Sequence, residues 1–368
     1  MLVLFAMLLI LCFAGCKLAP RGEKFVPDYM SVEKTMSIKG IFIILVFFLH
    51  FNSYVFYTMP LDKIYLSGIK EIGQCVVTLF MLYSGYGVME SVKKKGLSYV
   101  HRIPLQRILG TYFRFDIAII IFALVQLLIG KIYPIKQYFL SLTAWDAIGN
   151  SNWYIFAVAF LYLLTFIVFE IAGRRGNYYI PAAIFTAVLI AVVIVCDKTN
   201  IRHEYWYDTL ICYALGMWYS LLRDKIERLF SKSLAIYHVV LAVFMVASWL
   251  CMEYRNRSLA MLLLCMSLFA MTVVLVTMRI SFHNKALMWC GKNLFGLYIL
   301  QRIPMLLLKH WGLTQAGKVV DLGTEYFDFN IILCFVISAV VTVLLALVFE
   351  KITGRLWEII TSAGKKNT

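Results

Sequence analysis

Long apolar runs separated by short polar segments fill almost the whole chain. Most runs approach the roughly 20 residues that a helix needs to cross about 30 Å of hydrocarbon, although two of them, 207–222 and 293–308, are short. Because lipid cannot satisfy exposed backbone groups, the pattern predicts an all-α polytopic transmembrane helical bundle of about 10–11 helices. The runs lie near 2–16, 38–57, 72–91, 109–130, 152–172, 179–196, 207–222, 234–252, 258–278, 293–308 and 330–350.

The composition agrees with a membrane environment. The 368 residues are 62% hydrophobic and only 15% charged, whereas soluble domains are about half apolar and a quarter charged. No polar segment is long enough for a separate soluble domain. The formal net charge is +15, but no basic patch interleaves with aromatic residues. Anionic membrane lipid is therefore the expected partner of these cations, and nucleic acid is not.

Successive polar segments are alternately rich and poor in lysine and arginine, and this alternation predicts the orientation of the chain in the membrane. One set of alternate segments holds 22 of the 35 lysines and arginines, the other set holds 10, and three lie inside apolar runs. The positive-inside rule assigns the richer set to the cytoplasm, so the N-terminus is expected outside and the C-terminus in the cytoplasm. The rich segments are 17–37, 92–108, 173–178, 223–233, 279–292 and the residues after 350, and the poor ones are 58–71, 131–151, 197–206, 253–257 and 309–329.

Three parts follow from this pattern: an extra N-terminal transmembrane helix with its cytoplasmic linker (1–36), a membrane domain (37–356) and a cytoplasmic tail (357–368). No basic residue precedes the first run, which favours an uncleaved helix over a signal peptide, although "FAGC" ending at Cys16 resembles a lipoprotein cleavage site. The nine cysteines show no CxxC spacing and no cluster with histidine. We expect reduced, structural thiols and no metal site.

The stretch "SIKGIFIILVFFLHFNSY" carries two ionisable residues, Lys39 and His50. Eleven residues make almost three helical turns and rise about 16 Å, so both side chains are expected on one face. The predicted orientation puts Lys39 at the cytoplasmic end and His50 near mid-membrane. A histidine there could be a general base, a proton relay or a substrate ligand. The alternative is an interhelical hydrogen bond, which Asn52 could also make.

A second polar cluster reads "KKKGLSYVHRIPLQRILGTYFRFD". Its three leading lysines are typical topology determinants. Arg107 and Arg114 are seven residues apart, about two turns, and are expected on one face of a helix that begins at the cytoplasmic side. With Arg102 they are candidates for phosphate binding, because a guanidinium donates bidentate hydrogen bonds. The alternatives are lipid-headgroup contact or, for Arg114, an ion pair with Asp116 or Glu90.

Two further segments carry polar residues at the ends or within predicted helices. "LYSGYGVMES" places Ser84 beside Gly85, where small residues allow two helices to approach closely. "NSNWYIFAVAFLYLL" begins a helix with Asn152 and Trp153 at the outer interface. Aromatic residues are ordinary there, and the same residues could form a platform for a sugar.

In combination these motifs resemble the membrane acyltransferase-3 family. That family's first core helix carries an arginine eleven residues before a histidine, here "SIKGIFIILVFFLHF", and the later segments "LFMLYSGYG", "RILGTYF", "NWYIF" and "GKNLFGLYILQ" follow in the expected order over about residues 37–310. Three positions depart from the pattern. Lys39 replaces the usual arginine and lacks its fork, Gly110 stands where proline is frequent, and Gln301 stands at a late histidine.

The resemblance implies an integral-membrane O-acyltransferase in the bacterial cytoplasmic membrane, with residues 37–356 as its membrane domain. Such an enzyme transfers an acyl group, usually acetyl, from cytoplasmic acyl-CoA to a hydroxyl of a cell-surface or lipid-linked glycan. Acyl-CoA is then a co-substrate, and no bound cofactor is expected. The resemblance also implies that His50 is the catalytic residue. The residues expected to bind CoA phosphates are Lys39, Arg102, Arg107 and Arg114.

Two steps of this reaction stay open at the level of sequence. His50 could accept the proton of the attacking hydroxyl or carry the acyl group as a transient acyl-histidine. The thioester oxyanion needs a hydrogen-bond donor, which Asn52, Ser84 or Tyr86 could supply, and Asn152 and Trp153 could contact the acceptor.

Other functions remain possible from the sequence. A multi-pass transporter or flippase of a lipid-linked sugar or anion would use the same buried histidine and cations, but no inverted repeat and no pair of Gly/Pro-broken helices is visible. A glycan polymerase or ligase would be expected to have a longer outer loop than 131–151 or 309–329. A non-enzymatic membrane scaffold is the third alternative.

Overall fold

The computed structural model describes residues 1–55, 57, 60–311 and 326–366. These residues are almost entirely helical, with one two-stranded sheet. The elements are α1 (Leu2–Phe13), β1 (Cys16–Leu18), α2 (Val32–Phe51), α3 (Pro60–Ile72), α4 (Cys75–Lys95), α5 (Leu97–Val100), η1 (Ile103–Leu109), α6 (Gly110–Leu128), α7 (Ile135–Leu142), α8 (Trp153–Ala172), η2 (Gly173–Arg175), α9 (Tyr179–Thr199), η3 (Glu204–Trp206), α10 (Ile211–Lys232), α11 (Leu234–Tyr254), η4 (Arg255–Arg257), α12 (Leu259–Arg279), β2 (Ile280–Phe282), α13 (Lys285–Lys292), α14 (Leu294–Leu300), α15 (Arg302–Trp311) and α17 (Tyr326–Lys366).

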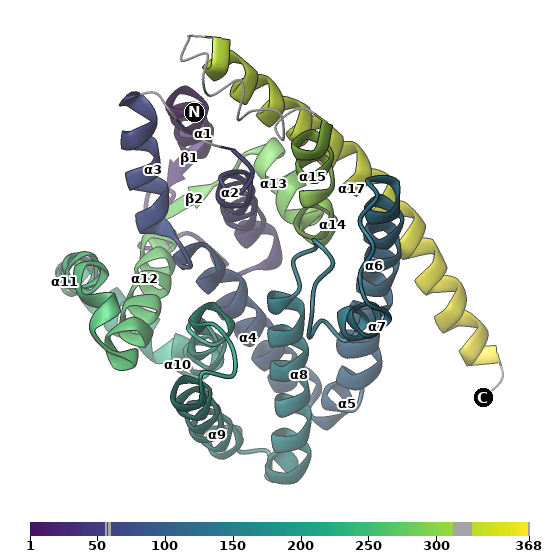
Figure 1. The fold of residues 1–368 in the computed structure, drawn as a ribbon. Helices are drawn as coiled ribbons and strands as arrows, with labels where there is room; N and C mark the ends of the chain where they lie inside the picture. The colour runs from purple at the N-terminus through teal and green to yellow at the C-terminus, as the bar shows by residue number, and fades with distance from the viewer. Residues whose placement is uncertain (56, 58–59, 312–325, 367–368) are drawn as a thin grey trace.

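Within the described ranges, seven helical segments are long and apolar enough to cross a membrane, judged by length and composition. The prediction of an all-α polytopic bundle is therefore confirmed, and the chain is a multi-pass membrane protein. Figure 1 shows the helices packed side by side, with α17 running along one outer side. The seven segments are Asp62–Lys95, Ile103–Leu128, Trp153–Ala172, Tyr179–Thr199, Leu234–Arg257, Leu259–Arg279 and Ile331–Ser362.

The helix that carries the histidine has different bounds from the predicted 38–57. It begins at Val32, because the Ser31 side chain caps it by accepting a hydrogen bond from the Lys34 backbone N–H at 3.3 Å. It ends at Phe51. His50 consequently lies in the last turn of α2, and not in the middle of a longer helix.

Two polar segments predicted as connections are helical. Residues 58–71 contain most of α3, which begins at Pro60, a residue whose fixed φ suits the first position of a helix. The predicted tail 357–368 continues α17, which has 41 residues and extends to Lys366. Apolar residues recur there at helical spacing (Leu356, Ile359, Ile360), which favours continuation of the helix. Most of the predicted outer loop 309–329 lies outside the described residues.

The first apolar run is shorter than predicted and leads into a strand. α1 ends at Phe13, and residues Cys16–Leu18 pair with Ile280–Phe282 as an antiparallel two-stranded sheet. Gly15 lies in the turn between α1 and β1 and has a φ of 84°, which glycine adopts without steric cost. The pairing was not predicted, because each strand has only three residues and its partner lies far away in the sequence.

The polar segments at each end of the bundle contact segments of the same predicted set. In the lysine- and arginine-rich set, Arg279 Nη1 donates to the Lys24 carbonyl at 2.7 Å. In the poor set, Arg255 forms an ion pair with Glu71 at 3.0 Å. Both contacts agree with the predicted grouping of these segments, and the orientation of the chain in the membrane stays a prediction.

Close packing of α4 on α10 depends on a reciprocal pair of glycines. A Cβ atom on Gly85 would lie 1.9 Å from the carbonyl oxygen of Tyr213, and one on Gly216 would lie 2.0 Å from that of Leu82. The close approach that the sequence predicted beside Ser84 is thus present, with α10 as the partner helix.

A second reciprocal pair joins α2 to α13. A Cβ atom on Gly40 would lie 1.9 Å from the Leu287 carbonyl oxygen, and one on Gly291 would lie 2.0 Å from that of Met36. These contacts fix the part of α2 that carries Lys39, because backbone pressed against backbone leaves little freedom to slide.

Candidate active site

A cavity of about 380 Å³ lies among α2, α4, η1, α8 and the α13–α14 region. Its wall combines two cations, three tyrosines and one serine with apolar side chains. The lining residues are Val32, Lys39, Phe80, Tyr83, Ser84, Gly87, Val88, Arg107, Tyr154, Tyr162, Gly291 and Leu294.

Lys39 and Arg107 bring two positive charges to this cavity from different elements. The Lys39 ammonium lies 5.6 Å from the centre of the Tyr83 ring. Arg107 lies 6.0 Å from the ring centres of Tyr99 and Tyr162, and its Nε donates to Tyr99 Oη at 3.2 Å. Neither cation forms an ion pair with a carboxylate in the described part of the chain. Both charges are thus available to an anionic ligand.

Arg107 and Arg114 have different surroundings, although their spacing predicted one face. The segment before α6, η1, is a π-helix. A π-helix has more residues per turn than an α-helix, so side chains seven residues apart no longer point in the same direction. Arg114 forms an ion pair with Glu350 of α17, rather than with Asp116 or Glu90, and stacks 4.4 Å from the centre of the Phe295 ring.

Arg102 occupies a third environment. It is the N-cap residue of η1, and its side chain is exposed. The lining of the cavity includes Arg107 but neither Arg102 nor Arg114. Of the four cations predicted to bind phosphate, the structure brings two together.

The candidates for oxyanion binding on α4 face opposite sides of the helix. Ser84 lines the cavity, and its Oγ lies 2.9 Å from Tyr162 Oη. Tyr86 is two residues further along, which corresponds to about 200° of rotation around a helix. Its side chain therefore points away from the cavity.

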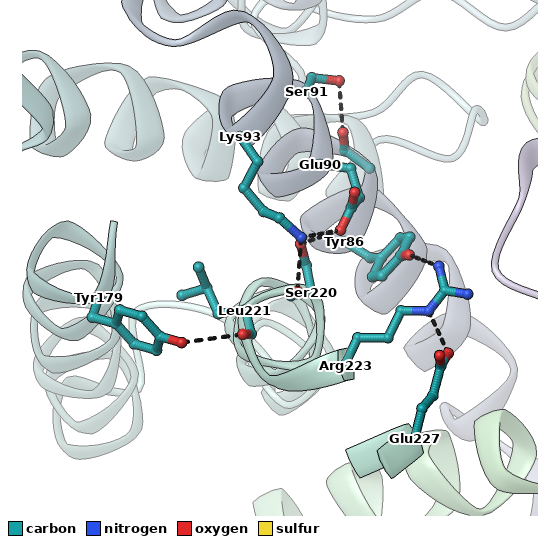
Figure 2. A network of polar contacts seen from close by, with 10 residues as sticks. Tyr86, Glu90, Ser91, Lys93, Tyr179, Ser220, Leu221, Arg223 and Glu227 are labelled. Carbon is teal, nitrogen blue, oxygen red and sulfur yellow. Dashed lines mark hydrogen bonds and ion pairs between the residues drawn. The ribbon is translucent and has the colours of Figure 1, made fainter. Parts of the chain in front are cut away.

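Figure 2 shows the network that Tyr86 joins instead. Arg223 donates to Tyr86 Oη at 2.9 Å and to Glu227 at 2.6 Å. In the same view Lys93 forms an ion pair with Glu90 at 2.7 Å. The Arg223–Tyr86 hydrogen bond joins α4 to α10 at the end of the bundle where the predicted cytoplasmic segments lie.

Asn52 makes local contacts where α2 ends. Its side-chain oxygen accepts hydrogen bonds from Tyr57 at 2.5 Å and from Tyr65 at 2.8 Å. These two bonds occupy the two lone pairs of an amide oxygen.

The two residues at the start of α8 also have nearby partners. The Asn152 side-chain amide donates to the Ala144 carbonyl at 3.1 Å. The Trp153 ring packs edge to face with Tyr205 at 5.9 Å. Neither residue lines the cavity, although the next residue, Tyr154, does.

His50 lies beyond the cavity, behind two tyrosines. Its ring centre is 6.2 Å from that of Tyr298, and the Tyr298 ring is 5.5 Å from that of Tyr154, which lines the cavity. The Nδ1 atom of His50 is buried and has no hydrogen-bond partner among the described residues. α2 is continuous from Lys39 to His50, so one helix connects the cationic cavity to the imidazole over about 16 Å.

Several residues around this site were not singled out by sequence reasoning. Tyr162 and Tyr298 were not singled out, because each is an uncharged residue inside an apolar run. Arg302 and Glu350 did carry a signal: each is a charge within a predicted apolar run, where ionisable residues usually have a partner or a function.

A comparison with protein-family models identifies the family of the chain that forms this site. The model of the acyltransferase-3 family, described as an acyltransferase domain, matches residues 37–351. No curated protein and no solved structure matches the chain. The matched segment contains Lys39, His50 and Arg107 and covers most of the 368 residues. The chain therefore belongs to the acyltransferase-3 family and is a multi-pass membrane acyltransferase.

Proposed function

We propose that the protein is an O-acyltransferase of the bacterial cytoplasmic membrane. It transfers an acyl group, with acetyl as the expected one, from cytoplasmic acyl-CoA to a hydroxyl of a cell-surface or lipid-linked glycan. The observation that carries this proposal is the cavity in which Lys39 and Arg107 lie without carboxylate partners. Lys39 is on the helix that also bears His50.

Lys39 and Arg107 bind the phosphates of acyl-CoA in this proposal. A guanidinium and an ammonium that lack carboxylate partners offer charge-assisted hydrogen bonds to phosphate oxygens. Each such bond stabilises by roughly 1.5–3 kcal/mol. Arg107 is exposed and Lys39 is partly exposed, so a ligand can reach both charges.

His50 acts on the acceptor hydroxyl. It takes the hydroxyl proton while the hydroxyl oxygen attacks the thioester carbonyl. The carbon–sulfur bond then breaks as the ester bond remains, and the proton passes from the imidazolium to the sulfur of CoA. Ser84 lies in the cavity with its Oγ 2.9 Å from Tyr162, and this pair of hydroxyls is the candidate donor to the oxyanion.

The test is transfer of labelled acetyl from acetyl-CoA by purified protein in proteoliposomes. We expect His50→Ala to abolish both labelled product and release of free CoA, while it still binds CoA. His238→Ala, which changes an exposed histidine on α11, is the matched control and retains activity. Wild-type turnover by His50→Ala would remove His50 from the mechanism. Movement of a lipid-linked sugar without CoA release would support a flippase instead.

A further inference from the structure

Polar groups gather around His50, next to the Tyr298 ring that separates His50 from the cavity. Among the described residues, the buried atoms His50 Nδ1 and Arg302 Nε have no hydrogen-bond partner. Ser151 is 3% exposed and Tyr298 is 8% exposed. An unpaired buried polar group costs about 1–3 kcal/mol, so a cluster of them indicates a binding site for a polar ligand.

These groups belong together in space. The rings of His50 and Tyr298 contact at 6.2 Å. Arg302 lies near both side chains, and the Ser151 hydroxyl lies within hydrogen-bonding reach of Tyr298 Oη. Tyr298 and Arg302 are four residues apart across Gln301, which keeps a helical conformation, so they share one face of the helix.

Arg302 is the unusual member of the cluster. It is half-buried, its Nε is inaccessible, and it forms no ion pair with any described residue. By contrast, Arg114 of α6 is paired with Glu350. A cation within an apolar run normally has an anionic partner, and the described protein supplies none for Arg302.

The surrounding groups favour an anion with several oxygen atoms. The planar guanidinium fits carboxylate or phosphate with two parallel hydrogen bonds. The Ser151 and Tyr298 hydroxyls can donate two more. Ser151 also lies two residues before the first residue of α8, next to its N-cap Asn152, and the N-terminus of a 20-residue helix attracts negative charge.

We propose that Arg302, Ser151 and Tyr298 bind an anionic group of the acceptor, a carboxylate or a phosphate, beside His50. The inference rests on the proposed function and specifies its acceptor: a negatively charged glycan or glycan precursor. The anion orients a neighbouring hydroxyl toward the imidazole. It also neutralises Arg302, so that an imidazolium at His50 no longer stands beside an unpaired positive charge.

The experiment compares acceptors that differ only in charge. The probes are methyl glucuronide and its neutral methyl ester, and methyl glucoside 6-phosphate and methyl glucoside, each supplied with labelled acetyl-CoA to the full-length protein. We expect wild type to prefer one charged probe by at least about tenfold in kcat/KM, equivalent to 1.4 kcal/mol. The preferred pair distinguishes a carboxylate from a phosphate.

Variants of Arg302 connect this preference to the site. Arg302→Gln is expected to remove the preference, and Arg302→Lys to restore part of it. Lys309→Gln, an exposed cation on the same helix α15, is expected to behave as wild type. Equal use of charged and neutral probes by wild type, or an unchanged preference in Arg302→Gln, would overturn the inference and leave the proposed function intact.

A binding measurement covers the case in which no probe is acetylated. His50→Gln protein is titrated with the charged and neutral probes, with and without the additional Arg302→Gln change. Binding of a charged probe that requires Arg302 supports the site. Absence of any charge-dependent binding overturns it, whereas loss of CoA binding and of CoA release would instead count against the proposed acyltransferase.

Discussion

Tyr154 and Tyr298 meet edge to face, with ring centres 5.5 Å apart. One ring lines the cationic cavity and the other contacts His50. The pair therefore separates the place proposed for CoA from the place proposed for the acceptor. For the hydroxyl beside His50 to attack the thioester, the acyl end of CoA must reach past this aromatic contact.

Removal of one ring of this pair tests the separation. We expect Tyr154→Ala to raise hydrolysis of acetyl-CoA in the absence of acceptor, because water can then reach the thioester from the His50 side. Tyr154→Phe keeps the ring and is expected to hydrolyse at the wild-type rate. The measurement is release of free CoA without acceptor. Equal hydrolysis by the two variants would show that the ring does not separate the two regions.

Neutralisation of the cavity cations should weaken CoA binding. Lys39→Gln and Arg107→Gln each remove a charged donor, and such bonds contribute roughly 1.5–3 kcal/mol. We expect KM for acetyl-CoA to rise by about tenfold or more, with a smaller change in kcat. Lys94→Gln, an exposed cation on α4, serves as the control. An unchanged KM in both cavity variants would exclude phosphate binding by these residues.

Arg114 should behave differently from Arg107 because Glu350 already pairs with it. Loss of either partner leaves the other charge half-buried and unpaired, and we expect Arg114→Gln and Glu350→Gln each to destabilise by about 1–3 kcal/mol. The double variant should lose less than the sum of the single changes. Unfolding in mixed micelles measures the stability. A large rise in KM for acetyl-CoA in Arg114→Gln would instead show that Arg114 takes part in phosphate binding.

The glycine contact between α4 and α10 predicts a position-specific loss of stability. Gly85→Ala would place its Cβ 1.9 Å from the Tyr213 carbonyl oxygen, and we expect a loss of about 1–3 kcal/mol, the usual cost of overpacking. Gly87→Ala on the same helix meets no atom within 4 Å and should be neutral or slightly stabilising. Thermal unfolding of the purified proteins compares them. Equal stability of the two variants would contradict the close approach of the helices.

The orientation inferred from charge can be measured directly. A reporter that is active only in the cytoplasm should work when fused after Lys366, because that end belongs to the lysine- and arginine-rich set. The same reporter inserted after Lys131, in the poor set, should be inactive. The opposite pair of results would place Lys39 and Arg107 on the side away from cytoplasmic acyl-CoA and would exclude the proposed donor site.

The sequence was sufficient for features that depend on local pattern. Apolar runs of transmembrane length indicated the helical membrane fold, because backbone groups in lipid must form their hydrogen bonds within the protein, and a single helix does so. The spacing of Lys39 and His50 also survives in the structure, since one unbroken helix carries both. Gly85 was identifiable because small residues within a span indicate close helix packing.

Tertiary structure decided everything that depends on partners distant in the chain. A π-helical segment, invisible in the hydropathy pattern, gave Arg107 and Arg114 different surroundings. Glu350 and Tyr298 reached Arg114 and His50 only through the packing of α17 and α14. Hydrophobicity is a property of each residue and its neighbours in sequence, whereas ion pairs and ring contacts depend on how helices cross. The chain by itself therefore specified a membrane helix bundle with a histidine and cations, and the crossing of its helices decided which of those charges lie together.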